Sequence, residues 1–589
     1  MVYKKPYVIQ INLLIIVLFT KISSDINIHV IPHTHLDPGW LKTPEEYYSE
    51  KNIKQIFNTV LNELTKGNKK TFVINEIYFF KRWYLKITEE DKQNFKQLIK
   101  EKRIEFVSGS YVINDEATPL YYNIIDQIRI GHQFLLEEFG IIPKTAWYID
   151  SFGHSAGNAH LLAQMNFENL IIGRIHEDFL ELMKNDKKLE FYWDPFGNNN
   201  SNKKILTHVL ALHYGYIMYL SNLGLPNEEF KYKLKDIIYK LILYLKEILK
   251  GIKYNNIIYL YGEDFKYADN NLFLNIDTLI DLFNNKMSNI ISQEELKRLF
   301  ETNENINIFY STPEKYFESI KKEMNEKNKN FDTYTNIDFF PLKSDCYWTG
   351  YFTSRPYLKG YIRKSSNIFY SLSQYHSFNR FINENINNTI INNLNNLREV
   401  VALSQHHDAI TGTCKQYVSS DYISKLKNGI ENVENDFTYE IQNKYKIKIG
   451  KICYNNYIVD ENDCSKEFFL SDNINEKEIK IGIYNPTISL EYNNLLINIE
   501  IEYSEYEYEI EGIKSDFFCI DKNNIENIEL YKYKNKCFLH FFYEFKKGEE
   551  LTIITLKKSS SKIGQEKYNK FNNNNTACRS QRSMRRPMH

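Results

Sequence analysis

The chain has 589 residues, of which 43% are hydrophobic and 25% charged. It is too long for one ordinary core, so we expect several folded domains. Lys and Arg total 74 against 75 Asp and Glu, so no net basic field would attract nucleic acid, and we expect no nucleic-acid partner.

Residues 1–24 have the layout of a secretory signal peptide. Lys4 and Lys5 precede an apolar stretch from about Tyr7 to Thr20, and small polar residues follow it. The stretch is shorter than the roughly 20 residues that cross a bilayer, which favours a cleaved peptide over a short membrane anchor. We therefore expect entry into the secretory pathway.

An oxidising compartment would allow disulfides among the seven cysteines. Cys453 and Cys464 bracket a short segment and are the best candidates for a pair, and Cys519 with Cys537 is the second candidate. Free buried thiols are the alternative.

Between residues 25 and about 175, short β-branched or aromatic runs alternate with longer helical patterns. The runs that predict strands are "INIHVIP", "KTFVIN", "IEFVSGS", "KTAWYI" and "NLIIGRI". Strands that alternate with helices predict βαβ units and a parallel sheet. We expect an α/β catalytic domain over residues 25–360.

Polar side chains follow three of these predicted strands. His35 and Asp37 follow the first, Asp150 follows the fourth, and Arg174 follows the fifth. Ligands of parallel sheets bind outside the carboxyl ends of the strands. We therefore expect these side chains to converge on one edge.

The rest of the chain changes character twice. Residues 361–450 are helical and predict a three-helix bundle whose second helix ends in "QHHD". Residues 475–560 alternate in short runs that predict the beginning of a β-sandwich. The polar, basic residues 561–589 predict a disordered tail.

The pair His35 and Asp37 is one half of a candidate zinc site. Zinc takes His and carboxylate ligands, often two from one loop and the others from distant segments. Asp150 and the "HHD" at 406–408 are the distant candidates. Each signal alone is weak, because an H-x-D pair is usually a turn and an HHD at a helix end is usually a cap.

Two carboxylates suggest a second chemistry. A retaining glycosidase needs a nucleophile and an acid/base about 5–5.5 Å apart. Asp150 lies in a short hydrophobic frame, and Asp345 lies among aromatic residues that would raise its pKa. Trp40 and Trp348 could pack on sugar rings, although core packing is the more common use of such residues.

Five segments in order strongly resemble glycoside hydrolase family 38, the class II α-mannosidases. They are "HVIPHTHLDPGWLKTPEEYY", "SGSYVINDEATPLYYNIIDQIRIGHQFLLEEFG", "WYIDSFGHSAGNAHLLAQMNF", "YWTGYFTSRPYLKGYIR" and "LSQHHDAITGTCKQYVSSDY". With the weaker "IGIYNPTISLEYNNLLINIEIEY", the resemblance covers most of residues 25–505.

The resemblance implies a retaining exo-α-mannosidase that releases terminal α-linked mannose from N-glycans or other oligosaccharides. The reaction would pass through a covalent mannosyl-enzyme, with one zinc ion per active site holding sugar hydroxyls. Asp150 would be the nucleophile and Asp345 the acid/base. The implied zinc ligands are His35, Asp37, Asp150 and His407, and the implied sugar-pocket residues are Trp40, Arg174, Asp264 and Asp408.

The chain also departs from the family pattern. Ser151 stands where the family usually has proline, and the family chain is longer, with further β-domains. The alternatives are therefore an inactive, truncated homologue that only binds sugar, or a zinc-dependent polysaccharide deacetylase built on a similar scaffold. The motifs are divided between lysosomal and Golgi types, so lysosome or vacuole, Golgi lumen and secretion all stay open, and so does the oligomeric state.

Overall fold

The structure is a computed structural model that describes residues 25–445, except for short gaps, and six strands between residues 478 and 562. The gaps are 51, 68, 198–202, 216–227, 285–291, 303, 342–346 and 383–387. The predicted signal peptide, residues 563–589 of the predicted tail, Asp345, Cys453 and Cys464 lie outside the described residues. Residues 561 and 562, predicted as part of the disordered tail, instead end a strand.

The first sheet of the α/β domain is built around β1 (Ile26–His35), which is buried along almost its whole length. β8 (Asn256–Asp264) pairs with one edge of β1, and β9 (Ile306–Tyr310) and then β2 (Phe72–Ile74) pair with the other. β3 (Ile104–Phe106) follows β2, and every pairing is parallel. The carboxyl end of β1 therefore lies beside that of β8.

A second sheet has the order β10-β6-β7-β5-β4. Its strands are β4 (Thr145–Tyr148), β5 (Asn169–Ile172), β6 (Glu190–Asp194), β7 (Ile205–Val209) and β10 (Asp332–Thr335). Only β6 and β7 pair antiparallel. The expected strands are thus divided between two sheets, joined by one continuous apolar core.

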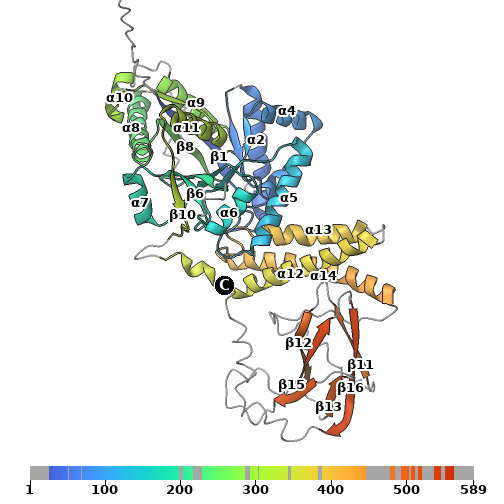
Figure 1. The fold of residues 1–589 in the computed structure, drawn as a ribbon. Coiled ribbons are helices and arrows are strands. Elements are labelled where there is room, and N and C mark those ends of the chain that lie inside the picture. The colour runs from blue at the N-terminus through green and yellow to red at the C-terminus, as the bar shows by residue number, and fades with distance from the viewer. Residues whose placement is uncertain are drawn as a thin grey trace, which may run out of the picture.

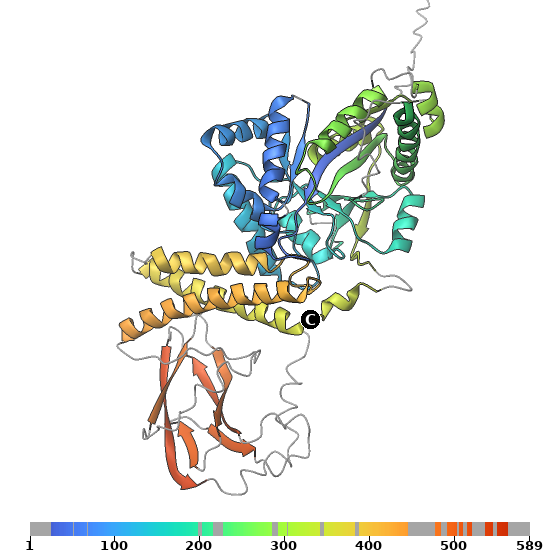
Figure 2. The same cartoon turned by 180° about the vertical axis from the view of Figure 1, so that it is seen from behind.

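Helices surround the two sheets (Figures 1 and 2). Residues 44–50 and 53–66 form two separate helices, because Asn52 takes a left-handed conformation with φ 53°. The helices are α1 (Pro44–Glu50), α2 (Ile53–Lys66), α3 (Ile77–Tyr84), α4 (Glu89–Lys100), α5 (Tyr121–Phe139), α6 (Ala156–Gln164), α7 (Glu177–Asn185), α8 (Glu228–Lys250), α9 (Asn271–Asn284), α10 (Gln293–Phe300) and α11 (Pro313–Glu326).

The predicted three-helix bundle is present. After the short 3-10 helix η1 (Thr349–Phe352) come α12 (Pro356–Ile382), α13 (Asn388–Leu403) and α14 (Gln416–Tyr445). The expectation that the second helix ends in "QHHD" is wrong: α13 ends at Leu403, and the motif lies in the loop 404–415. That loop returns to the α/β domain, because the His407 N–H donates to the carbonyl of Ile113 at 3.1 Å.

Ion pairs join the bundle to α5 and α3 of the α/β domain. Arg398 of α13 makes a two-pronged contact with Asp126, at 2.8 and 2.6 Å. Glu399 accepts hydrogen bonds from Lys81 at 2.7 Å and from the Tyr111 hydroxyl at 3.0 Å. Figure 1 shows the bundle, in yellow to orange, lying across one end of the α/β domain.

The C-terminal strands form two three-stranded antiparallel sheets, as the predicted sandwich requires. Their orders are β11-β16-β13 and β12-β15-β14. The strands are β11 (Glu478–Tyr484), β12 (Tyr492–Glu502), β13 (Tyr506–Ile510), β14 (Ser515–Ile520), β15 (Lys536–Phe545) and β16 (Leu551–Lys562).

The second candidate disulfide pair falls inside this domain. Cys519 and Cys537 are opposite each other in the register of β14 and β15. A disulfide between them stays a prediction. Across the described residues, no helix combines the length and the apolar character that crossing a bilayer requires.

Candidate metal centre and active site

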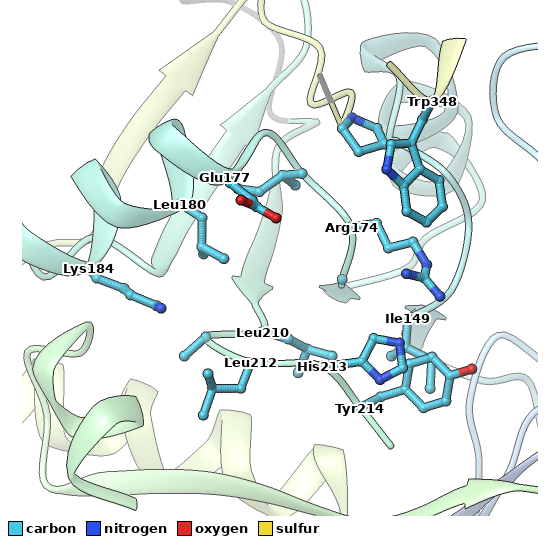
Figure 3. A pocket seen from close by; sticks show the side chains of 14 residues that line it. Ile149, Arg174, Glu177, Leu180, Lys184, Leu210, Leu212, His213, Tyr214 and Trp348 are labelled. Atoms are coloured by element: carbon cyan, nitrogen blue, oxygen red, sulfur yellow. The ribbon is translucent and has the colours of Figure 1, made fainter. Parts of the chain in front are cut away.

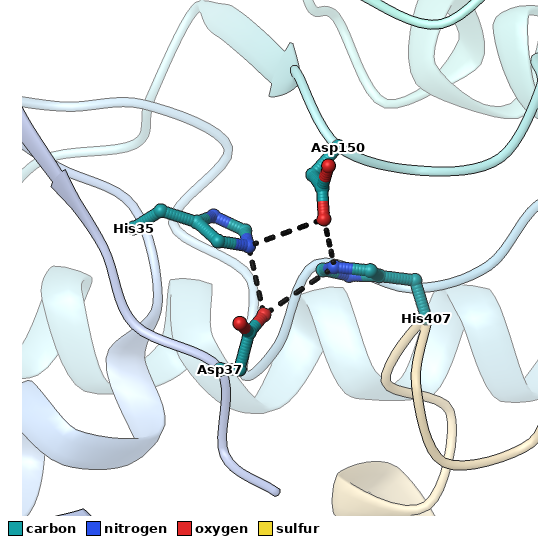
Figure 4. A group of neighbouring side chains, drawn as sticks. All are labelled: His35, Asp37, Asp150 and His407. Atoms are coloured by element: carbon teal, nitrogen blue, oxygen red, sulfur yellow. Dashed lines mark hydrogen bonds and ion pairs between the residues drawn. The ribbon is translucent and has the colours of Figure 1, made fainter. Parts of the chain in front are cut away.

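Four side chains from three distant segments point toward one another at the ends of β1 and β4 (Figure 4). His35 ends β1 and Asp37 follows it, Asp150 follows β4, and His407 comes from the loop after α13. One ligand atom from each residue lies within 4.8 Å of every other. All four residues are buried.

The distances inside this cluster suit a metal ion. His35 Nε2 lies 2.7 Å from Asp37 Oδ1 and 3.6 Å from Asp150 Oδ2. His407 Nε2 lies 3.4 Å from Asp37 Oδ1 and 3.1 Å from Asp150 Oδ2. A zinc ion about 2.0–2.2 Å from four tetrahedral donors would separate those donors by about 3.3–3.6 Å.

Unpaired polar atoms support the same interpretation. Both ring nitrogens of His35 and Oδ1 of Asp37 are buried and have no well-formed hydrogen bond within the described part of the chain. Burial alone would lower the pKa of His35, but the carboxylates of Asp37, Asp150 and Glu76 raise that pKa to about 10. The cluster therefore favours positive charge, which a divalent cation bound by two His and two Asp would supply.

The backbone fixes which nitrogen of His407 faces the cluster. Nδ1 of His407 lies 3.0 Å from the carbonyl of Ile113, which can only accept a hydrogen bond. Nδ1 therefore carries the proton, and Nε2 keeps its lone pair for the cluster.

Asp150 uses its two carboxylate oxygens differently. Oδ2 belongs to the cluster, while Oδ1 accepts hydrogen bonds from the Arg174 guanidinium, one of them at 2.8 Å from Nε. Burial would raise the pKa of Asp150, but the hydrogen bond and charge of His407 and the charge of Arg174 outweigh burial and hold the pKa at about 2. Asp150 is therefore an ionised carboxylate at neutral and mildly acidic pH.

Aromatic rings form one side of the site. The guanidinium of Arg174 lies over the ring of Trp348 at 4.9 Å. Phe152 packs against Trp348 at 5.5 Å and edge-on against His407 at 5.7 Å. Trp348 keeps 38% of its surface exposed, so it can present a face to a ligand as well as pack.

A pocket opens beside Arg174, the partner of Asp150, and extends toward α7 (Figure 3). Arg174 and Trp348 lie on one side of it, and Leu180 and Lys184 of α7 lie on the other. Its remaining wall is mostly apolar, from the residues that follow β4, β5 and β7. A group bound next to Asp150 could extend into this pocket.

Of the other sequence-predicted residues, Asp264 and Asp408 lie near the cluster. Asp264 is opposite His35 in the register of β8 and β1. Asp408 is buried, which raises its pKa to about 7, and it accepts a hydrogen bond from Thr413 at 2.5 Å. Trp40 is half-buried, and its carbonyl accepts from the Lys415 N–H at 3.0 Å. Asp345 lies outside the described residues.

Tyr214 and Glu76 also belong to the site and, like Phe152, were not singled out from the sequence. The Tyr214 hydroxyl donates to Asp264 at 2.8 Å, and its ring lies 5.3 Å from that of His35. Glu76 places Oε1 3.6 Å from Nδ1 of His35. Glu76 follows β2, so the rule that finds polar residues after strands would also have found it.

Comparison with known protein families assigns the domains that carry this cluster. Residues 25–337 match the model of the glycosyl hydrolases family 38 N-terminal domain. Residues 346–442 match the alpha mannosidase middle domain. The chain belongs to glycoside hydrolase family 38. The two matches correspond to the α/β domain and the bundle, which together contain the ligand cluster.

Curated relatives and solved structures of the family are similar to this chain. It is 32% identical to "Lysosomal alpha-mannosidase" of Dictyostelium discoideum over 69% of this chain and 40% of the relative. It is 31% identical to "Lysosomal alpha-mannosidase" of Bos taurus, over 69% of this chain and 41% of the relative. The chain thus spans about two fifths of the length of these relatives.

A solved α-mannosidase from Enterococcus faecalis shares the fold. It superposes with a TM-score of 0.58 over 92% of this chain and 57% of that chain, at 14% identity. The superposition supports the arrangement of α/β domain, helical bundle and β-domain.

Proposed function

We propose that this family 38 chain is a retaining exo-α-mannosidase that hydrolyses terminal α-linked mannose with the help of a bound zinc ion. The observation that carries the proposal is that the two carboxylate oxygens of Asp150 have different partners. One oxygen lies among the four candidate ligands, and the other is held by Arg174. Such a carboxylate can help to hold a metal and still present an oriented, ionised oxygen to a sugar.

Asp150 acts as the nucleophile in this proposal. Oδ1, oriented by Arg174, attacks the anomeric carbon and forms a covalent mannosyl-enzyme while the glycosidic bond breaks. A general acid protonates the leaving oxygen and then, as a base, deprotonates the water that hydrolyses the intermediate. Asp345 is our candidate for this acid/base, on the sequence resemblance alone.

His35, Asp37, Asp150 and His407 would hold the zinc ion. Zinc bound there supplies positive charge and orientation to the hydroxyls of the terminal mannose. Asp408, Asp264 and Trp40 are proposed to contact the same sugar, and the pocket beside Arg174 to receive the leaving-group side of the substrate.

The proposed substrates are mannose-containing oligosaccharides, including the glycans of glycoproteins. The printed names of the relatives include lysosomal α-mannosidases, and the N-terminal residues have the layout of a signal peptide. We therefore propose action in the secretory pathway, in a lysosome or vacuole.

The variant Asp150→Asn tests the proposal. It removes the nucleophile and one ligand charge together, so we expect no detectable hydrolysis of an aryl α-mannoside and less bound zinc. The matched control is Asp236→Asn, at an exposed position of α8, which should retain wild-type turnover. Turnover like that of the wild type in Asp150→Asn would refute the assignment.

A further inference from the structure

In the two histidines of the ligand cluster, the ring nitrogen that faces away from the cluster has a different partner. His407 points its outer nitrogen at a main-chain carbonyl, that of Ile113. His35 points Nδ1 at the carboxylate of Glu76, at 3.6 Å. Within the described residues no group forms a hydrogen bond with this nitrogen, so Glu76 is the partner that the structure offers.

The backbone around Glu76 is fixed on both sides. The Val107 N–H donates to the carbonyl of Ile74 at 3.0 Å, and the Ile77 N–H donates to the carbonyl of Ser110 at 3.0 Å. The Glu76 side chain is only 3% exposed. A buried carboxylate is costly unless it faces a donor or a positive charge, and the His35 ring, 3.6 Å away, can supply either.

We infer that Glu76 is a positioning residue for metal binding: it accepts the Nδ1 proton of His35, fixes the ring with Nε2 toward the cluster, and makes that nitrogen a stronger donor to the metal. Metal-bound histidines commonly donate their other N–H to a carboxylate or carbonyl, and losing such a partner costs about 10–100-fold in metal affinity. The inference rests on the proposed zinc site but assigns Glu76 no contact with substrate.

Zinc affinity, measured on the full chain by competition with a chromogenic chelator, tests the inference. Glu76→Gln keeps the size of the side chain but removes its charge, and we expect zinc to bind about 10–100-fold more weakly. Glu76→Asp keeps the charge on a shorter side chain and should recover part of the loss.

Glu105→Gln is the matched control. Glu105 lies opposite Val73 in the register of β3 and β2, and its carboxylate accepts the Glu314 N–H at 2.9 Å. It does not belong to the candidate ligand cluster found among the described residues. The zinc affinity of Glu105→Gln should stay within about threefold of the wild type. That change is much smaller than the loss expected when a metal-binding histidine loses its hydrogen-bond partner.

A second readout separates positioning from a general structural role. The melting temperature without zinc should be similar in Glu76→Gln and the wild type, while the rise on adding zinc should be smaller in the variant. If Glu76→Gln does not fold, Glu76→Asp must show the weaker binding by itself.

The outcomes distinguish this inference from the proposed function. Wild-type zinc affinity in a folded Glu76→Gln, or in Glu76→Asp where Glu76→Gln does not fold, would overturn the role of Glu76 alone if the wild-type enzyme is active. A wild-type chain that binds no zinc would overturn both.

Discussion

His29 of β1 is a buried histidine outside the ligand cluster that makes stability depend on pH. Its ring contacts Ser311 Oγ at 2.8 Å and Asn256 Oδ1 at 3.0 Å. Burial lowers its pKa from 6.5 to about 4. Between pH 4 and 6.5 the unfolded chain therefore binds more protons than the folded chain. The free energy of unfolding is highest above pH 6.5, where His29 is neutral in both states, and it falls as the pH drops toward 4.

We expect this residue to reduce the free energy of unfolding by about 3 kcal/mol between pH 6.5 and 4. Denaturant unfolding at several pH values measures it. His29→Gln, which can keep both hydrogen bonds, should flatten the decline by about that amount, whereas His160→Gln, at a more exposed ring, should not. An unchanged slope in His29→Gln would contradict the pKa assignment.

Single residues could be predicted from the sequence where a strand end and a family motif coincide. His35, Asp37 and Asp150 satisfy both conditions, and the structure brings them together with His407. Tyr214 could not be predicted, because it is one of 45 tyrosines and its position depends on packing between β7 and β8. The contribution of Asp345 stays a prediction.

At the scale of elements, Gly173 allows the end of β5 to approach the end of β4. A Cβ at this position would lie 2.1 Å from the carbonyl oxygen of Ile149, directly before Asp150. Gly173→Ala should therefore destabilise the fold by about 1–3 kcal/mol and separate Arg174 from Asp150, which would lower activity at least about tenfold.

Thermal unfolding and aryl α-mannoside hydrolysis measure both effects. Gly67→Ala is the control, because a Cβ there meets nothing within 4 Å, and it should resemble the wild type. If Gly173→Ala also resembles the wild type, the close approach of these two strand ends is not required.

The loop 404–415 depends for its position on Arg355, directly before α12, and on the first turn of α12. Arg355 donates to the carbonyls of Gly412 and Cys414, both at 2.9 Å, and Lys359 donates to that of Thr411 at 2.8 Å. Arg355→Ala would leave the carbonyls of Gly412 and Cys414 without this donor, at a cost of about 1–3 kcal/mol. Because the loop carries His407, we expect weaker zinc binding in calorimetric titration.

Arg363→Ala provides the comparison, since Arg363 is an exposed arginine of α12, the helix that begins directly after Arg355. It should bind zinc like the wild type. Equal zinc affinity in both variants would mean that the loop keeps its geometry without Arg355.

The order of elements was predictable, but several of their details were not. Periodicity placed the strands that end in His35 and Asp150, because their apolar runs are short and bounded by polar residues. The division into two sheets depends on pairings such as β1 with β8, more than 200 residues apart. Local patterns carry no information on such pairings.

At the scale of the whole molecule, the ligand cluster joins two domains. His35, Asp37 and Asp150 come from the α/β domain, and His407 comes from the bundle. A metal that binds only the folded chain stabilises it by about 2.7 kcal/mol at 100 times its dissociation constant. We therefore expect chelation to lower the melting temperature, and limited proteolysis between the domains to become faster.

Zinc returned in excess over the chelator should reverse both effects, and magnesium, which prefers oxygen ligands, should not. A melting temperature that is independent of chelator would argue against a metal bridge between the domains.

The central claim is that this family 38 chain hydrolyses α-mannosides with a metal held by His35, Asp37, Asp150 and His407. The most direct measurement is the rate of aryl α-mannoside hydrolysis by the chelated chain as zinc is titrated back. We predict that activity is lost on chelation and rises linearly to a plateau at one zinc per chain. Full activity without metal, or no activity in a folded chain with one zinc bound, would contradict the account.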